Sequence, residues 1–194
     1  MKINLGCGKF KLNGFINIDI DKSVNPDLVW DIKKLPYEDN SIEEIYFGHC
    51  LEHFTLIDAR KVLKECYRVL NENGFIGIVV PEKDLTPKNM INGEDSKYMK
   101  HHSYWDMDLL KKEVKKVGFK VIEEMDIKTY PYLVARPLWQ IGVIAYKSKK
   151  IILQKSSIDK VGFNEREYSW CKNENKVVYN PTKKRHCPFC KELL

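Results

Sequence analysis

Long apolar runs are missing from this chain of 194 residues, although hydrophobic residues make up 43% of it. No stretch approaches the roughly 18 consecutive apolar residues of a transmembrane helix, so no membrane span is expected. The first residues, MKINLGCG, lead into an expected strand and lack the pattern of a secretory leader, which predicts a cytoplasmic protein. The apolar and aromatic content suits the core of one domain of ordinary size.

Net charge is also nearly absent from most of the chain. Residues 1–146 hold 21 Lys and Arg against 22 Asp and Glu, whereas residues 147–194 hold 12 against 5. The basic end either contacts an acidic partner, such as nucleic acid or an anionic lipid surface, or is a solvated surface without a partner. We therefore separate a body, residues 1–147, from a basic C-terminal extension, residues 148–194.

The six cysteines form two groups. Three lie within apolar patterns of the body and are expected to be small buried thiols: Cys7, Cys50 and Cys66. Three cluster in the extension and are candidate zinc ligands, because metal binding is favoured over disulfides in a reducing compartment: Cys171, Cys187 and Cys190. Their spacing matches a zinc ribbon except that Tyr168 stands where the first cysteine belongs. A zinc site with a fourth ligand from elsewhere, a degenerate ribbon and unrelated thiols are the alternatives.

Hydrophobic periodicity in the body alternates between strands and helices. Helices are expected from a capping Thr55 to residue 70, ended by a left-handed Asn or Gly within 71–74, and from a capping Asp106 to residue 116. Strands are expected at 2–5, 15–20, 27–30, 45–47, 75–80, 119–124 and 139–146. This order predicts an α/β fold with a mostly parallel sheet and helices on both faces. Ligands of such folds bind beyond the carboxyl ends of the strands.

Three consecutive strand ends carry groups suited to adenosine. The first strand exits through N-L-G-C-G, where Gly6 and Gly8 let the backbone approach a ligand closely. Asp19 ends the second strand, where a carboxylate can accept both hydroxyls of a ribose. Asp31 ends the third, where it can accept from the amine of an adenine. Each acid alone could be a turn former, but their joint placement favours an adenosine site.

With these features the chain resembles the class I S-adenosylmethionine-dependent methyltransferases, most of all the type 11 group, over roughly residues 1–147. The resemblance is carried by NLGCG (4–8), NIDI (17–20) and the segments 30–54, 68–82 and 101–123. It implies a Rossmann-like sheet of seven strands with S-adenosylmethionine across its carboxyl edge. It also implies cofactor-binding residues: Asn4, Gly6, Cys7 and Gly8 toward the methionine part, Asp19 at the ribose, and Asp31 with Ile32 at the adenine.

The implied activity is methyl transfer to a small-molecule, sugar or glycan acceptor. A nucleic-acid or protein methyltransferase guided by the basic extension is an alternative, although the Asp/Asn-Pro-Pro-Tyr/Phe motif of amino-directed DNA enzymes is missing. A non-catalytic cofactor-binding or regulatory protein of the same fold is another. Its support is that Asn4 replaces the usual acid before the first glycine, and that a third glycine and a full first helix are missing.

The stretch GHCLEHF, residues 48–54, contains H-x-x-E-H, the pattern of inverted zinc peptidases. In those enzymes both histidines lie on one helix, whereas the preceding strand and Gly48 place His49 at a strand end. The peptidase interpretation is therefore set aside. His49 is instead the candidate general base, needed only if the acceptor is a hydroxyl or similarly weak acid; an anchored loop histidine is the alternative. Glu52 and His53 are expected to brace the loop. His101 and His102 either face the acceptor or lie at the surface.

Overall fold

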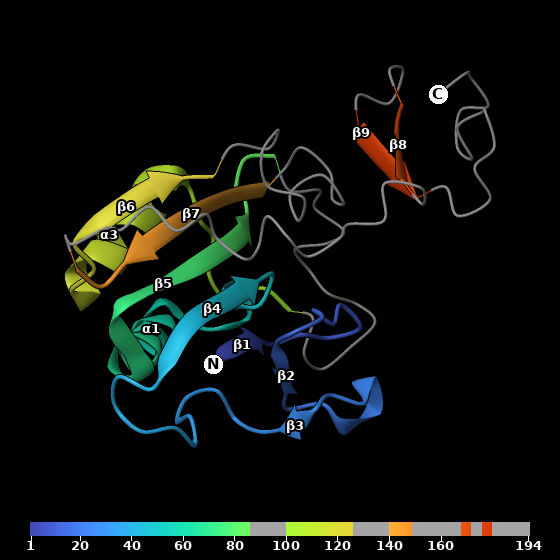
Figure 1. Cartoon of the computed structure of the whole chain (residues 1–194). Helices are drawn as coiled ribbons and strands as arrows, with labels where there is room; N and C mark the ends of the chain where they lie inside the picture. Colours follow the sequence, from blue (N-terminus) through green and yellow to red (C-terminus); the bar gives the residue numbers. More distant parts are fainter. Residues whose placement is uncertain (86–99, 126–139, 149–167, 172–175, 180–194) are drawn as a thin grey trace.

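The computed structural model describes residues 1–85, 100–125, 140–148, 168–171 and 176–179. Its body is built on one seven-stranded sheet of order β3-β2-β1-β4-β5-β7-β6 (Figure 1). Only β7 runs antiparallel to its neighbours. The strands are β1 (Lys2–Leu5), β2 (Ile16–Asp19), β3 (Leu28–Val29), β4 (Ile42–Gly48), β5 (Leu70–Pro81), β6 (Val121–Glu124) and β7 (Gln140–Tyr146). The predicted mostly parallel, Rossmann-like sheet is confirmed.

Two α-helices begin at the predicted caps. In α1 (Leu56–Val69), Thr55 Oγ1 accepts the backbone N–H of Asp58 at 3.2 Å. In α3 (Met107–Val117), Asp106 Oδ1 accepts the backbone N–H of Leu109 at 2.7 Å. Such caps satisfy backbone donors that have no partner within the helix. Two short 3₁₀ helices, η1 (Lys22–Val24) and η2 (Leu51–His53), follow β2 and β4.

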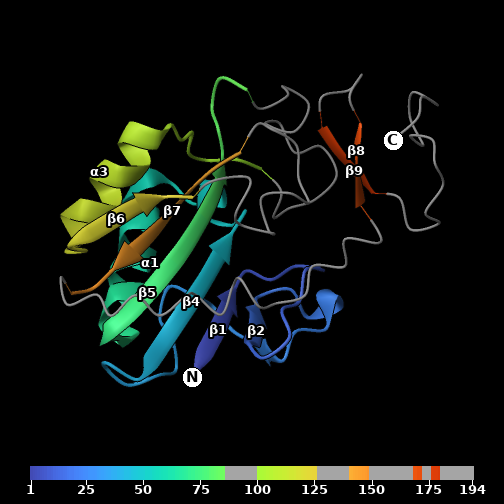
Figure 2. The ribbon, with the colours of Figure 1, turned by 45° about the horizontal axis from the view of Figure 1, so that its top comes forward.

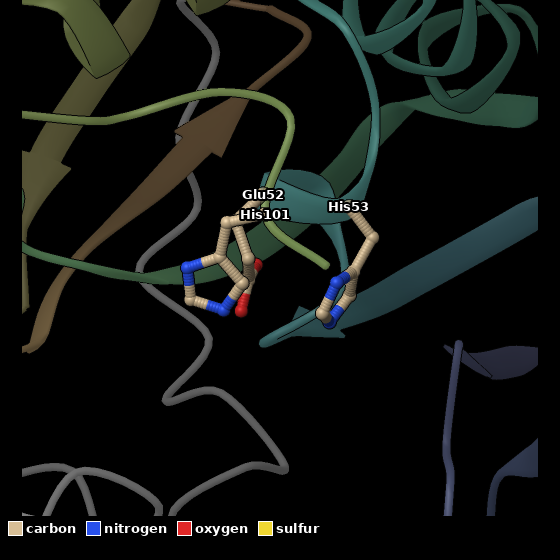
Figure 3. A group of neighbouring side chains, drawn as sticks. All are labelled: Glu52, His53 and His101. Carbon is tan, nitrogen blue, oxygen red and sulfur yellow. The ribbon is translucent and has the colours of Figure 1, made fainter. Parts of the chain in front are cut away.

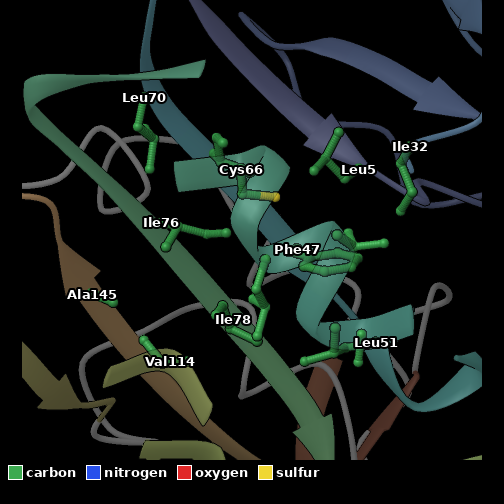
Figure 4. Close-up of a cluster of buried hydrophobic side chains, with 14 of the residues drawn as sticks. Leu5, Ile32, Phe47, Leu51, Cys66, Leu70, Ile76, Ile78, Val114 and Ala145 are labelled. Carbon is green, nitrogen blue, oxygen red and sulfur yellow. The ribbon is translucent and has the colours of Figure 1, made fainter. Parts of the chain in front are cut away.

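Both helices lie on the same side of the sheet (Figures 1 and 2). The sheet residues that face them alternate along the strands, and Figure 4 shows Phe47, Ile76 and Ile78 beside Cys66 of α1 and Val114 of α3. All five side chains are fully buried. Burying a large apolar side chain contributes about 1.5–3 kcal/mol, so this layer stabilises the fold.

The second face of the sheet carries a smaller cluster. It consists of buried residues from the loop after β1, from three strands and from the position directly after β6: Leu12, Phe15, Tyr46, Val79, Met125 and Ile144. Residues 6–15, which connect β1 to β2, contribute to this layer as a turn-rich loop without a helix. Within the described ranges, therefore, the expected helices on both faces are found on one face only.

The end of α1 differs from the prediction. No left-handed Asn or Gly follows at 71–74; Leu70 is extended, with φ −64° and ψ 135°, and β5 starts there. Other partners satisfy the final carbonyls, because Lys147 Nζ donates to Leu70 O at 2.7 Å and Asn40 N donates to Arg68 O at 3.0 Å. The left-handed residue at this junction is Asn40, with φ 59°. Periodicity alone could not reveal these distant partners.

The extension contains a hairpin of β8 (Tyr168–Cys171) and β9 (Lys176–Tyr179). The body's sheet ends at Tyr146, and the boundary at residue 147 stays a prediction. Among the helices that the structure describes, none is long and apolar enough to cross a membrane.

Candidate active site

The loop after β1 is tied to the carboxyl end of β2. Gly6 and Gly8 have φ of 59° and 50°, in the left-handed region that favours glycine. The backbone N–H of Gly8 donates to Asp19 Oδ2 at 2.7 Å, and that of Cys7 donates to Ile18 O at 3.1 Å. Asp19 therefore positions the glycine turn from the neighbouring strand.

The two glycines of this turn have different surroundings. A Cβ on Gly6 would lie 2.2 Å from Cys50 Sγ and 2.7 Å from Cys50 Cβ, so this glycine packs against the residues that leave β4. A Cβ on Gly8 would meet nothing within 4 Å. A ligand can therefore approach the backbone at Gly8 without displacing protein atoms.

The chemistry of Asp19 fits the ribose of the implied cofactor. Its Oδ1 accepts the backbone N–H of Asp21 at 2.9 Å, while Oδ2 accepts that of Gly8. A carboxylate offers about four accepting positions, so each oxygen keeps one for a hydroxyl. Asp19 is half-buried and remains open to a ligand.

The Asn4 side chain holds the loop that follows β1 in place. Its side chain is 1% exposed, and its Nδ2 donates to Phe10 O and to Asn17 Oδ1, both at 2.9 Å. Asn17 Oδ1 also accepts the backbone N–H of Leu12 at 2.8 Å. Both partners of Asn4 are acceptors, which explains an amide here, since an ionised acid has no proton to donate. Asn4 and Asn17 thus hold the loop in this conformation.

The Cys7 thiol lies between the two glycines and is 5% exposed. Burial, followed by the charge of Asp19, raises the pKa of Cys7 to about 11. The thiol is therefore neutral at physiological pH and acts as a small packing group in the turn.

At the expected adenine position, the side chains of Asp31 and Ile32 have different surroundings. The Asp31 side chain is exposed, and its Oδ1 accepts the backbone N–H of Lys33 at 2.9 Å. Ile32 is 6% exposed and packs into the main core (Figure 4), so only its backbone can face a ligand.

Sequence reasoning missed exposed apolar side chains beside these two acids. Ile20 is 52% exposed and Trp30 42%. The backbone N–H of Trp30 donates to Asp19 O at 2.9 Å, which brings both side chains to the end of β2. Large apolar groups at a polar edge suit contact with a purine face. The available signal was an apolar residue directly after Asp19 and another directly before Asp31.

His49 leaves β4 in a strained conformation. Its φ is 51°, uncommon for a residue with a bulky side chain, and such strain often lies at functional sites. His49 Nε2 lies 2.8 Å from Gln140 Oε1, and Nδ1 lies 3.5 Å from Glu52 Oε1. Both ring nitrogens thus face polar partners, and the role of His49 as a base requires one of these contacts to open.

Glu52 lies deeper than the sequence suggested. It is 2% exposed, and its Oε2 has no hydrogen-bond partner among the residues that the structure describes. Burial acts to raise the pKa of this carboxyl, but the hydrogen bond with His49 and the charges of His49 and His53 outweigh burial and lower it. The result is a buried carboxylate with one oxygen unused.

His53 and His101 lie beside the Glu52 carboxylate (Figure 3). The backbone N–H groups of His102 and Ser103 donate to Glu52 O at 2.8 and 3.1 Å, which holds this segment against η2. The rings of His53 and His101 meet edge to face, with centroids 5.3 Å apart. His101 is therefore brought to the site, whereas His102 is exposed.

The candidate zinc ligands of the extension cannot be placed in the same way. Cys187 and Cys190 lie outside the described residues. Cys171 ends β8, and only its backbone is described. Zinc binding by these cysteines stays a prediction.

Comparison with known proteins supports the class that this geometry indicates. Residues 15–78 match the family model described as "Methyltransferase domain". A search of the curated proteins finds no match.

Solved structures share the fold. A methyltransferase from Methanosarcina mazei is 14% identical with a TM-score of 0.56, over 76% of this chain and 92% of that one. One from Archaeoglobus fulgidus is 17% identical with a TM-score of 0.55, over 75% and 85%. One from Thermotoga maritima is 15% identical with a TM-score of 0.55, over 75% and 81%. All three are described as dependent on S-adenosylmethionine.

At these identities the structures establish the fold, and the family match adds the methyltransferase domain. Together, the match of residues 15–78 to a methyltransferase domain and the shared fold support the predicted class I S-adenosylmethionine-dependent methyltransferase.

Proposed function

We propose that this methyltransferase acts on a small-molecule, sugar or glycan acceptor. The observation that carries the cofactor assignment is the contact between Gly8 and Asp19, which places an open glycine backbone beside a carboxylate with accepting positions to spare. The preference for a small acceptor rests on the resemblance of the sequence. The cytoplasmic location and the zinc site of the extension stay predictions beside it.

S-adenosylmethionine supplies an electrophilic methyl group, so the protein's task is to align an acceptor atom and exclude water. Gly6 and Gly8 would receive the methionine part, Asp19 the ribose hydroxyls, and Asp31 with Ile20 and the backbone of Ile32 the adenine. His49 leaves the neighbouring strand at the same edge. We assign it the transfer of a proton from a hydroxyl acceptor, with Glu52 orienting the ring at Nδ1.

Calorimetry with S-adenosylmethionine and its demethylated product tests the cofactor site. An Asp19→Asn variant should bind both about 10–100-fold more weakly, because hydrogen bonds to a charged group contribute about 1.5–3 kcal/mol. Asp21→Asn is the matched control, since the Asp21 side chain caps η1 by accepting the backbone N–H of Ser23. Unchanged affinity in Asp19→Asn would overturn the assignment of the ribose site, and binding of neither compound by the unaltered chain would overturn the cofactor assignment itself.

The acceptor class requires a transfer assay with a labelled methyl group. Incorporation into sugars or small hydroxyl compounds, but not into RNA, DNA or protein, is the expected result. Incorporation into nucleic acid or protein would instead favour an enzyme guided by the basic extension. Cofactor binding with no transfer to any class would favour a regulatory protein.

The assignment of His49 is tested with His49→Asn, because asparagine tolerates the left-handed backbone better than most residues. A base contributes about 10²–10⁴-fold to rate, so kcat should fall in that range while cofactor affinity is retained. A fall of less than about tenfold would make His49 a positioning residue.

A further inference from the structure

We propose that Glu52, His53 and His101 form a binding site for a divalent metal ion, with Zn²⁺ as the best fit. One potential ligand atom from each residue lies within 4.8 Å of the others. Two imidazoles and one carboxylate form a donor set typical of zinc sites that keep a coordination position open. Figure 3 shows the three side chains gathered at the carboxyl edge of the sheet.

The strongest support comes from the unused oxygen of Glu52. A buried carboxylate oxygen without a partner is costly, and native proteins normally satisfy such atoms with a hydrogen bond or an ion. Glu52 Oε1 faces His49 Nδ1, whereas Oε2 has no partner among the described residues. A cation bound at Oε2 would satisfy it.

His53 is already oriented as a metal ligand. Its Nδ1 lies 3.2 Å from the carbonyl oxygen of Lys100, so this nitrogen carries the proton and donates it to the carbonyl. With the proton on Nδ1, Nε2 is the ring nitrogen whose lone pair can bind a metal ion. Metal-binding histidines commonly donate the other ring N–H to a backbone carbonyl in this way, which fixes both tautomer and ring orientation.

The backbone holds the two parts of the site together without metal. Glu52 and His53 belong to η2, and His101 reaches them because the N–H groups of His102 and Ser103 donate to Glu52 O. Ligand atoms of a tetrahedral Zn²⁺ lie roughly 3.3–3.5 Å apart, so the side chains must close by no more than roughly 1.5 Å. Side-chain rotation can supply a movement of this size.

This arrangement uses the H-x-x-E-H motif differently from a zinc peptidase. There both histidines bind the ion from one helix, whereas here His49 turns to Gln140 and Glu52, and His101 takes its place as the second imidazole. Cys50, two residues before Glu52, faces the position where Gly6 would carry a Cβ. The metal would thus lie at the same edge as the cofactor loop. On the proposed function, its open position suits an acceptor bearing an oxygen or nitrogen donor.

Metal analysis of the full chain tests the site, with Cys171, Cys187 and Cys190 all replaced by serine so that the extension contributes no thiolate. After dialysis against Zn²⁺ and removal of free metal, this parent should retain one Zn²⁺ per chain. Its Co²⁺ derivative should lack the near-ultraviolet charge-transfer absorption of a thiolate ligand. His53→Ala, His101→Ala and Glu52→Gln in this parent should each weaken Zn²⁺ binding by about 100-fold or more, because changes beyond the direct ligands already cost 10–100-fold.

His102→Ala is the matched control and should retain the ion, since His102 is exposed next to His101. Circular dichroism in a chelator checks that each variant folds. If a variant does not fold, the parent is instead modified with diethyl pyrocarbonate and its peptides are analysed. Zn²⁺ should protect His53 and His101 from modification but not His102. A parent without Zn²⁺, unchanged binding in folded His53→Ala and His101→Ala, or no protection would overturn the site. None of these measurements depends on methyl transfer, so failure of this site is distinguishable from failure of the proposed function.

Discussion

Adding one methyl group to either glycine of the cofactor turn should have different effects on stability. Gly8→Ala introduces a Cβ at φ 50° with no atom within 4 Å. A left-handed residue with a Cβ costs about 1–2 kcal/mol. The smaller entropy of the unfolded chain offsets about 0.4–1 kcal/mol of this. A net destabilisation of about 1 kcal/mol is therefore expected for Gly8→Ala.

Gly6→Ala carries the same backbone cost plus a steric conflict. The new Cβ would lie 2.2 Å from Cys50 Sγ, so either the loop or the exit of β4 must move. Overpacking of this kind costs about 1–3 kcal/mol, giving a total of about 2–4 kcal/mol. Combining Gly6→Ala with Cys50→Gly removes both conflicting atoms, and the two changes should show a favourable coupling of about 1–3 kcal/mol.

Urea unfolding followed by tryptophan fluorescence measures these differences. Calorimetry adds the effect on the cofactor, where Gly8→Ala should weaken S-adenosylmethionine binding by about tenfold or more because its Cβ occupies space meant for the ligand. Gly14→Ala is the matched control: its φ is 80° and a Cβ there meets nothing within 4 Å, but it lies outside the turn. Equal destabilisation by Gly6→Ala and Gly8→Ala, zero coupling with Cys50, or equal binding by Gly8→Ala and Gly14→Ala would refute these assignments.

Three further changes test the surroundings of the site. Asn4→Asp should destabilise by about 1–3 kcal/mol in urea unfolding, because two buried acceptors lose their donor; a stability at or above the parent's would contradict the loop network. Arg60 donates to buried Glu113 and lowers its pKa from 4.5, so the parent has this stabilisation near neutral pH and loses it as the pH falls below 4.5. Arg60→Met should therefore cost stability at pH 7 and progressively less in acid; a penalty independent of pH would count against the pair. Cys7 should react with iodoacetamide at pH 8 at least about 100-fold more slowly than a free thiol, measured by peptide mass spectrometry, and labelling at the free rate would show that it is not buried.

Local signals explain which parts of the fold were predictable. The caps Thr55 and Asp106 lie next to the helices that they start, and the glycine turn directly follows the strand that it ends. Asp19 ends β2 as expected, and the carboxyl ends of parallel strands lie at one edge of the sheet. Each inference required only neighbouring residues and one topological rule.

Contacts between residues far apart in the sequence could not be predicted in this way. Gln140 meets His49 across 91 positions of sequence, and Lys147 reaches Leu70 across 77. The expected end of α1 was wrong for this reason, because the partners that satisfy its carbonyls come from other elements. The same limit hid the approach of His101 to Glu52, which depends on backbone hydrogen bonds between two separate segments.

Side chains of neighbouring strands hold the connection between β1 and β2, which contains no helix. A helix after β1 would fix the glycine turn through its own backbone bonds and offer its N-terminus to the cofactor. Here Asn4 donates to the loop at Phe10, Asn17 accepts from Leu12, and Asp19 accepts from Gly8. The side chains of Asn4, Asn17 and Asp19 make these contacts from two neighbouring strands, which the sheet holds in place. The turn is therefore preorganised by side chains beneath and beside it.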